Sequence, residues 1–347
     1  MGGIIVLRDK NIPLSSQDFE EKKYHEISSK EHALVCFSFA GKVQWAVSLY
    51  GTNPQIHLST NGERIFLLSS ALTYHLPTKD AYQEAFGGEV DMYISCWSNT
   101  GKLHWASFYG AHGDEHGLSL CTDSQDNLYL LGASNFTSLP EARANREFPN
   151  SLLQVFLVSF NKEGIFRHLE RFPVRDQFFQ RTSWGMTYHP LTQKLLICST
   201  LAPSFSTSLS SPGHDRNPHV LNNKHLSDSP WNDIYLMSYD CINNSIEWDG
   251  ICFGITNDER ILSIGTKNMT IDTKGNIYLG GFIVQSLTKA EPLQSDFFST
   301  LPSPALTSGD INPAFYIKVS PQGKIEAFSF FGNETRYYAK ILSWFWR

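Results

Sequence analysis

Charged side chains recur in four short segments, each of which follows a strand-like apolar run. The segments combine acids with arginines or histidines: His112, Asp114, Glu115 and His116; Arg175, Asp176 and Arg181; Asp258, Glu259 and Arg260; and Glu334 and Arg336. Arginine grips a carboxylate through two parallel N–H donors, so a recurring acid and arginine can tie neighbouring units of a repeat together. We favour ion pairing between units for these residues, and we treat them as the candidate binding site.

Two other chemistries are open to the same residues. The run His112-Gly113-Asp114-Glu115-His116 contains side chains that ligate metal ions, although this spacing on a loop fixes no ligand geometry. Carboxylates from several units could serve as general acid and general base on a glycan, but nothing in the sequence sets the separation that this chemistry needs. We therefore expect no metal, no cofactor and no catalytic residue.

The elements that must position these residues belong to an internal repeat. The segment Gly41–Ala46 (GKVQWA) recurs sixty residues later as Gly101–Ala106 (GKLHWA). Each copy follows an alternating apolar run and leads to Tyr-Gly, a pattern that predicts a β-hairpin around a glycine turn. The tryptophans of the two copies, Trp45 and Trp105, occupy one strand position, and we expect them to pack between units.

A second hairpin type recurs at 118–132 and 269–280. In both copies an aspartate opens a tight turn that closes on an asparagine, a residue that tolerates positive φ. Counting both types along the chain gives five copies of each of four strands. The first strands are expected at 55–60, 117–122, 185–189, 268–272 and 339–344, and the second strands at 3–8, 64–69, 127–132, 194–199 and 276–281. The third strands are expected at 33–39, 91–97, 154–160, 233–239 and 314–319, and the fourth strands at 43–50, 103–109, 165–171, 245–252 and 325–331.

Four-stranded units repeated around a ring form a β-propeller, in which no long sheet edge is left open. The counts balance only when 3–8 and 339–344 belong to the same unit. The fold class we predict is all-β: one domain over residues 1–347, a five-bladed β-propeller of four-stranded antiparallel blades. The N-terminal strand pairs in the blade of the C-terminal strand and closes the ring.

The repeat resembles the SBBP-type bacterial β-propeller repeat family. The segment 110–117 (GAHGDEHG), continuing through Asp123, Asn127 and Gly132, carries the best match, and Gly254–Gly281 carries the second-best. All five units follow the same order of elements, although those around 54–70 and 173–200 lack the full Asp-x-x-Gly-Asn turn. The resemblance implies a propeller, an extracellular or cell-surface location and no enzyme activity.

Loop lengths distinguish the two faces of the predicted disc. Connections from first to second strand and from third to fourth strand share one face and are short. The long connections lie on the opposite face, which we call the long-loop face, and they are Asp9–His32, Ser70–Val90, Ser134–Leu153, Thr200–Asn232 and Phe282–Pro313. Long loops without regular structure commonly carry function, so we expect the binding site on that face, around the mouth of the central channel.

Composition narrows the class of partner. The chain has a formal net charge of −6, a pI near 6.0 and no basic run, which argues against nucleic acid or an anionic membrane as the partner. No secretion signal precedes the first strand, which favours a cytoplasmic location over the one that the resemblance implies. The six cysteines form no C-x-x-C pair, and we expect buried free thiols.

We therefore expect a monomeric, non-catalytic binding or scaffold module that holds a protein or carbohydrate on the long-loop face. The alternative is a hydrolase or lyase that acts on a glycan with carboxylates at the channel mouth. Amide substitution of Asp114, Asp258 and Glu334 distinguishes the two, because only an enzyme would lose turnover.

Overall fold

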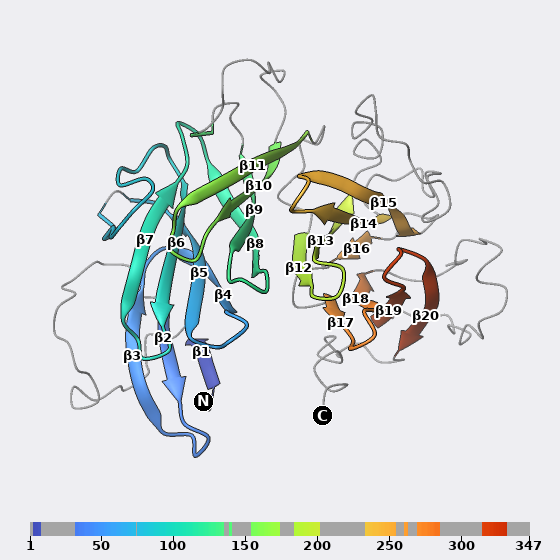
Figure 1. Cartoon of the computed structure of the whole chain (residues 1–347), viewed down its shortest axis with the longest axis horizontal. Helices are drawn as coiled ribbons and strands as arrows, with labels where there is room; N and C mark the ends of the chain where they lie inside the picture. The colour runs from blue at the N-terminus through green and yellow to red at the C-terminus, as the bar shows by residue number, and fades with distance from the viewer. Residues whose placement is uncertain are drawn as a thin grey trace. The chain divides into compact units, whose positions relative to one another are not determined.

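The computed structural model describes ten stretches of the chain: residues 3–7, 32–73, 75–134, 139–140, 154–173, 184–201, 233–254, 260–262, 269–284 and 314–331. The regular elements in these stretches are all β-strands (Figure 1). The chain divides into two compact units, residues 1–171 and 172–347, and each is described by itself. The described residues include no helix long and apolar enough to cross a membrane.

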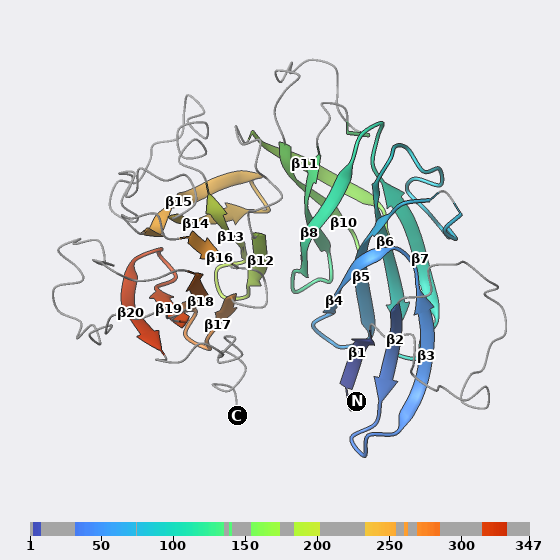
Figure 2. The ribbon, with the colours of Figure 1, turned by 180° about the vertical axis from the view of Figure 1, so that it is seen from behind.

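Unit 1 contains three antiparallel sheets. The first is β1 (Gly3–Leu7), β2 (His32–Phe37) and β3 (Val43–Leu49), which lie side by side in that order (Figure 2). The second is β4 (Thr52–Leu58), β5 (Arg64–Ala71), β6 (Asp91–Ser98) and β7 (Leu103–Tyr109). The third is β8 (Glu115–Thr122), β9 (Leu128–Ser134), β10 (Gln154–Phe160) and β11 (Phe166–Pro173).

Unit 2 contains two further sheets with the same strand order. One is β12 (Trp184–His189), β13 (Lys194–Leu201), β14 (Asp233–Asp240) and β15 (Ser245–Gly254). The other is β18 (Ile277–Val284), β19 (Ala314–Val319) and β20 (Ile325–Phe331), with β16 (Arg260–Leu262) and β17 (Met269–Ile271) both paired to β18. The inner position of this sheet is therefore occupied by two short strands, where the sequence predicted one.

The first-to-second turns form as the sequence predicts, and the reason is the aspartate side chain. Asp123 Oδ1 accepts hydrogen bonds from the backbone N–H groups of Gln125 and Asn127, at 2.8 and 2.9 Å. Its Oδ2 accepts from Asn127 Nδ2 at 2.7 Å and from the Tyr129 hydroxyl at 3.3 Å. The side chain thus satisfies the donors that the chain reversal leaves without strand partners.

The turn that joins β17 to β18 repeats this arrangement. Asp272 Oδ1 accepts from the backbone N–H groups of Lys274 and Asn276, and Oδ2 accepts from Asn276 Nδ2 and the Tyr278 hydroxyl. Four equivalent hydrogen bonds in two sheets confirm the predicted hairpin at the level of single atoms.

Neighbouring sheets of unit 1 are joined by the repeated tryptophan. Trp45 of β3 donates its indole N–H to Asn99 O at 3.0 Å, and Trp105 of β7 donates to Lys162 O at 3.0 Å. Both acceptors lie in the third-to-fourth turn of the next sheet. A Cβ atom on Gly101 would lie 2.9 Å from the Trp45 ring, so only glycine leaves room for the indole. The prediction that these tryptophans pack between neighbouring four-stranded repeats, here neighbouring sheets of unit 1, is confirmed.

The strands β5, β6 and β9 are buried on both faces, as expected where sheets stack against sheets. A cluster in unit 1 joins the second and third sheets through fully buried side chains that include Phe66, Tyr109 and Phe156. The aromatic rings meet edge to face or tilted; Tyr109, for example, lies 5.8 Å from Phe156 and 6.0 Å from Phe160. Burial of this kind holds the ends of β6, β7 and β8 in fixed positions.

The long connection between β5 and β6 is described except for residue 74, and it packs along the outer edge of β7. Lys79 N donates to Ala106 O at 3.0 Å and Ala106 N donates back to Lys79 O at 2.8 Å, while Phe108 N donates to Gln83 O at 3.1 Å. The loop therefore covers a strand edge that would otherwise expose unpaired backbone groups. Tyr82 on the same loop stacks on Phe166 of β11 at 5.5 Å.

Every described strand range overlaps a predicted one except β16, for which the sequence carried no expectation. The predicted strand 339–344 lies outside the described residues, as do the loops 9–31, 141–153, 202–232 and 285–313. Among the described residues, nothing pairs with the edge of β1 opposite to β2. All-β architecture and four-stranded antiparallel sheets are thus established for the chain.

Candidate functional site

Of the residues expected to bind, four are described with their side chains: His112, Asp114, Glu115 and His116. They lie between β7 and the start of β8, where the second sheet of unit 1 passes into the third. Arg260 is the first residue of β16, and only its backbone is described. The remaining candidates lie outside the described residues: Arg175, Asp176, Arg181, Asp258, Glu259, Glu334 and Arg336.

Glu115 is fully buried, with 0% of its surface exposed. Its Oε1 accepts a hydrogen bond from the Ser134 hydroxyl at 2.6 Å, and its Oε2 accepts from Ala111 N at 2.7 Å. Both oxygens are therefore hydrogen-bonded to uncharged groups. We expected acids in this segment to pair with arginines, but the hydrogen bonds described for Glu115 come from a serine and a backbone amide.

A second buried carboxylate, Asp91, faces the same place from the start of β6. It too is 0% exposed. Its Oδ2 accepts from Gly87 N at 2.8 Å and from Gln83 Nε2 at 3.3 Å, and its Oδ1 accepts from Gly88 N at 3.2 Å. Asp91 therefore fastens the last part of the β5–β6 loop to the strand that follows it.

Gly110 lies between the two carboxylates. A Cβ atom on this glycine would come closer than 3.0 Å to both Asp91 Oδ1 and Glu115 Oε2, so these two oxygens are no more than twice that distance apart. Gly110 N donates to Gln83 Oε1 at 3.1 Å, which gives Gln83 contacts with both Gly110 and Asp91. We call Asp91, Glu115, Gly110, Gln83 and Ser134 the carboxyl junction.

Backbone contacts show that the junction links two sheets. Glu115 N donates to Val90 O at 2.6 Å, Glu89 N donates to Gly113 O at 3.2 Å, and Val90 forms a parallel bridge with Asp114. A Cβ on Gly88 would overlap the carbonyl oxygen of Gly113, so the two loops approach backbone to backbone. These backbone contacts join the end of the β5–β6 loop to the connection between β7 and β8, and the two carboxylates lie beside them.

Burial controls the electrostatics of the junction. Loss of solvent raises the pKa of Asp91, although the donors from Gly87, Gly88 and Gln83 oppose this. Burial also raises the pKa of Glu115; Ser134 and Ala111 oppose the shift, while the negative charges of Asp91 and Asp114 add to it. Two like charges this close in a desolvated site favour retention of a proton by one of them.

The histidines of the segment lie outside this buried cluster. Both are exposed, and His112 Nδ1 lies 3.4 Å from Gly87 O. Across the described parts of the chain, no group of three His, Cys, Asp or Glu side chains is arranged to hold a metal ion. The carboxyl junction itself brings only two such side chains together.

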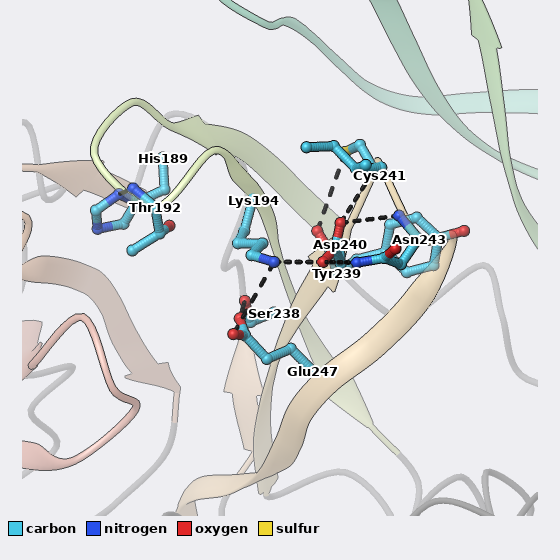
Figure 3. A network of polar contacts seen from close by, with 10 residues as sticks. His189, Thr192, Lys194, Ser238, Tyr239, Asp240, Cys241, Asn243 and Glu247 are labelled. Atoms are coloured by element: carbon cyan, nitrogen blue, oxygen red, sulfur yellow. Dashed lines mark hydrogen bonds and ion pairs between the residues drawn. The ribbon is translucent and has the colours of Figure 1, made fainter.

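Unit 2 contains a polar network of a different type, shown in Figure 3. Lys194 at the start of β13 pairs with Asp240 at the end of β14 and lies 4.0 Å from Glu247. Asp240 also accepts from Ile242 N and from Asn243 N and Nδ2. Burial alone would raise the pKa of Asp240, but the donors from Lys194 and Asn243 outweigh it and hold this pKa well below its usual range. This network stabilises a hairpin turn.

The described thiols are unsuited to nucleophilic chemistry. The thiols of Cys36, Cys96, Cys121 and Cys198 are buried, and that of Cys241 is partly buried. Burial raises the pKa of Cys96 to about 11 and that of Cys198 to about 12, so both remain protonated thiols at neutral pH.

Asp91 was not among the candidates, because the argument from sequence followed the loops after the fourth strand. A signal was present in the strands themselves. Asp91-Met92-Tyr93 at the start of β6 recurs as Asp233-Ile234-Tyr235 at the start of β14. An aspartate at matching positions of a repeat was a sequence signal that could have added Asp91 to the candidates.

No protein-family model matches the sequence, and a search of curated proteins finds no match. Among solved structures, a protein of unknown function from Dyadobacter fermentans is 10% identical with a TM-score of 0.36, over 81% of this chain and 70% of that one. An apocarotenoid oxygenase variant from Synechocystis is 12% identical with a TM-score of 0.37, and the match covers 86% of this chain and 55% of the oxygenase. Likenesses this distant carry no argument about function.

Proposed function

We propose that this chain is a closed five-bladed β-propeller with SBBP-type repeats, and that it acts as a non-catalytic binding or scaffold module. Its partner, a protein or a carbohydrate, would bind on the long-loop face. Support for the ring comes from the equal strand order of the described sheets and from the edge of β1, which can accept one more strand. That strand would be 339–344.

The observation that carries the non-catalytic proposal is the burial of Glu115 with both carboxylate oxygens hydrogen-bonded inside the protein. A general acid or base must reach the proton that it transfers. Glu115 and Asp91 are both 0% exposed, so a substrate has no access to either of them. Their hydrogen bonds have a structural role: Asp91 binds the β5–β6 loop, and Glu115 binds Ser134 and Ala111.

Binding on the long-loop face is supported by the contrast between short and long connections. The described short turns are closed by their own hydrogen bonds, as in the turns of Asp123 and Asp272. The long connections provide the chain length from which a variable recognition surface can be built. In the proposed ring, charged candidates such as Asp114 and Arg336 would lie in the connections on that side and would supply its polar contacts.

A direct test combines a glycan array with a screen of glycan hydrolysis on the intact chain. In two matched variants, a short Gly-Ser linker replaces either residues 286–311 or residues 204–229. We expect a bound glycan or protein partner to be lost with at least one loop, while circular dichroism shows both variants folded. Asp114→Asn, Asp258→Asn and Glu334→Gln should leave the wild-type baseline of the hydrolysis screen unchanged.

Catalytic turnover would overturn the proposal. If the wild-type chain hydrolyses a glycan and any one of the three amide variants abolishes this turnover, the protein is an enzyme with carboxylates at the channel mouth. Binding that survives both loop replacements would place the partner elsewhere and would contradict the proposed face.

A further inference from the structure

The two carboxylates of the carboxyl junction differ in how their oxygens are occupied. The donors described for Asp91 are all N–H groups, two from backbone amides and one from Gln83. An N–H group can only donate, so a proton on Asp91 would find no hydrogen-bond acceptor among these groups. Asp91 is therefore the carboxylate that the surrounding donors keep ionised.

Glu115 has a partner that can reverse its role. The Ser134 hydroxyl lies 2.6 Å from Glu115 Oε1, and a hydroxyl oxygen accepts as readily as it donates. A proton on Oε1 would point at Ser134 Oγ, while Oε2 would keep its hydrogen bond from Ala111 N. Protonation of Glu115 thus costs no hydrogen bond to the described groups, and it removes the repulsion from Asp91.

We propose that Glu115 holds a proton that it donates to Ser134 while Asp91 stays ionised, and that loss of this proton as the pH rises loosens the loop 83–90 from Asp91, Gly110 and the start of strand β8. The protonated junction carries one negative charge on two carboxyl groups. When the proton leaves to solvent, Ser134 donates to Oε1 again, and two negative charges face each other across Gly110.

The other charged or titratable groups described near the junction are Asp114, Tyr109, Arg171 and His112. Asp114, next to Glu115, adds negative charge and favours the proton. Tyr109 on β7 is buried, and burial raises the pKa of its hydroxyl, so it stays neutral; Arg171 on β11 opposes that shift. His112 places its ring nitrogen near Gly87 O and away from the carboxylates.

The end of the β5–β6 loop is the element that would move when Glu115 loses its proton. Its attachment at this end depends on Gly87 N, Gly88 N and Gln83, all of which bind Asp91 or Gly110, and on Glu89 N, which binds Gly113 O. Repulsion between Asp91 and Glu115 acts directly on these contacts. Further along the loop, the pairing of Lys79 with Ala106 contains no ionisable hydrogen bond and would persist.

Hydrogen exchange measured between pH 5 and pH 8.5, corrected for the intrinsic exchange rate, tests the proposal on the full chain. We expect protection of the Gly87, Gly88 and Glu115 amides to fall at least tenfold with rising pH, while the amides of Lys79 and Ala106 keep theirs. In Glu115→Gln the amide side chain can donate to Ser134 and accept from Ala111, so protection should stay high at every pH. Glu163→Gln, at an exposed site, is the matched control and should behave as wild type.

Infrared spectroscopy gives a second readout that does not depend on loop motion. A protonated carboxylic acid has a carbonyl band distinct from that of a carboxylate, and this band should persist in the wild type near pH 6 and be lost in Glu115→Gln. Protection that is independent of pH in the wild type would overturn the proposal, as would an unchanged pH response or an unchanged infrared band in Glu115→Gln.

Discussion

The turn aspartates and the carboxylates of the junction differ in what faces them, and the difference sets the sign of their effect on stability. Asp272 is partly exposed and accepts four hydrogen bonds, so its negative charge is well solvated by the protein. Although burial opposes the shift, the donors from Asn276, Lys274 and Tyr278 lower its pKa below the ordinary 3.8. For Asp91 and Glu115, burial dominates and raises the pKa.

The first prediction concerns Asp272. A depressed pKa in the folded state contributes stability at pH values above 3.8 that is lost as the pH falls through the folded-state pKa. Asp272→Asn should lower the unfolding free energy by about 1–2 kcal/mol at pH 7, because charge-assisted hydrogen bonds are lost. Below pH 3 the variant and wild type should converge. Urea unfolding at several pH values measures this; a difference that stays constant down to pH 2.5 would contradict it.

For the carboxyl junction, the pH dependence of stability has the opposite sign. A raised pKa in the folded state contributes stability below the unfolded-state pKa, and this contribution is lost as the pH rises through the folded-state pKa. Glu115→Gln should therefore change stability little at pH 4.5 and make the protein more stable than wild type above the folded-state pKa of Glu115. Thermal unfolding at pH 5 and pH 8 checks the sign, and a variant that is less stable than wild type at pH 8 would refute it.

Gly110 gives a third prediction at the same scale. A methyl group there would overlap the Asp91 carboxylate and crowd Glu115 Oε2. Both groups are buried and held by hydrogen bonds, so neither can move without losing a contact. We expect Gly110→Ala to destabilise the protein by about 1–3 kcal/mol, the typical cost of overpacking. Wild-type stability of Gly110→Ala in urea unfolding would show that the junction can rearrange.

At the scale of elements, the repeated hairpins supply a matched pair of glycines. Gly41 and Gly101 occupy the same position of the β2–β3 and β6–β7 turns, with φ of 75° and 82°. A Cβ on Gly41 meets nothing within 4 Å, whereas a Cβ on Gly101 meets the Trp45 ring at 2.9 Å. The two sites therefore share a positive φ, and they differ in whether a described side chain lies within reach of an added methyl group.

Alanine at these positions separates the cost of positive φ from the cost of displacing the Trp45 ring. Gly41→Ala should lower the unfolding free energy by about 1 kcal/mol, because alanine disfavours positive φ. Gly101→Ala should cost about 1–3 kcal/mol more, because the methyl group displaces the indole that joins two sheets. Tryptophan fluorescence should shift in Gly101→Ala and stay unchanged in Gly41→Ala. Equal losses of stability would mean that the contact between Trp45 and Gly101 contributes nothing.

The hairpins could be predicted because their signals are local. Alternating strands, Gly41 and Gly101, and the Asp–Asn turns all specify a chain reversal within a few residues. The position of Glu115 could not be read in the same way, because its burial depends on Asp91 and Ser134 from other strands. The strand β16 was missed for a related reason: residues 260–262 carry no alternation, and pairing with β18 determines their conformation.

At the scale of the whole molecule, the proposed ring depends on one strand that comes from the far end of the chain. The described sheets with four strands place their first strand next to the second, as β4 lies next to β5 and β8 next to β9. The corresponding neighbour of β1 is not among the described strands. An apolar strand edge without a partner promotes pairing with other chains.

Deletion of Ile341–Arg347 tests this closure. If 339–344 pairs with β1, its loss opens the ring and exposes a strand edge, so the truncated chain should unfold or oligomerise instead of losing only a tail. A synthetic peptide of residues 333–347 added during refolding should restore a monomer by strand addition, and a peptide of scrambled sequence should not. Size-exclusion chromatography with light scattering and circular dichroism measures both. A truncated chain that remains a monomer and unfolds cooperatively at the wild-type temperature would refute the closure.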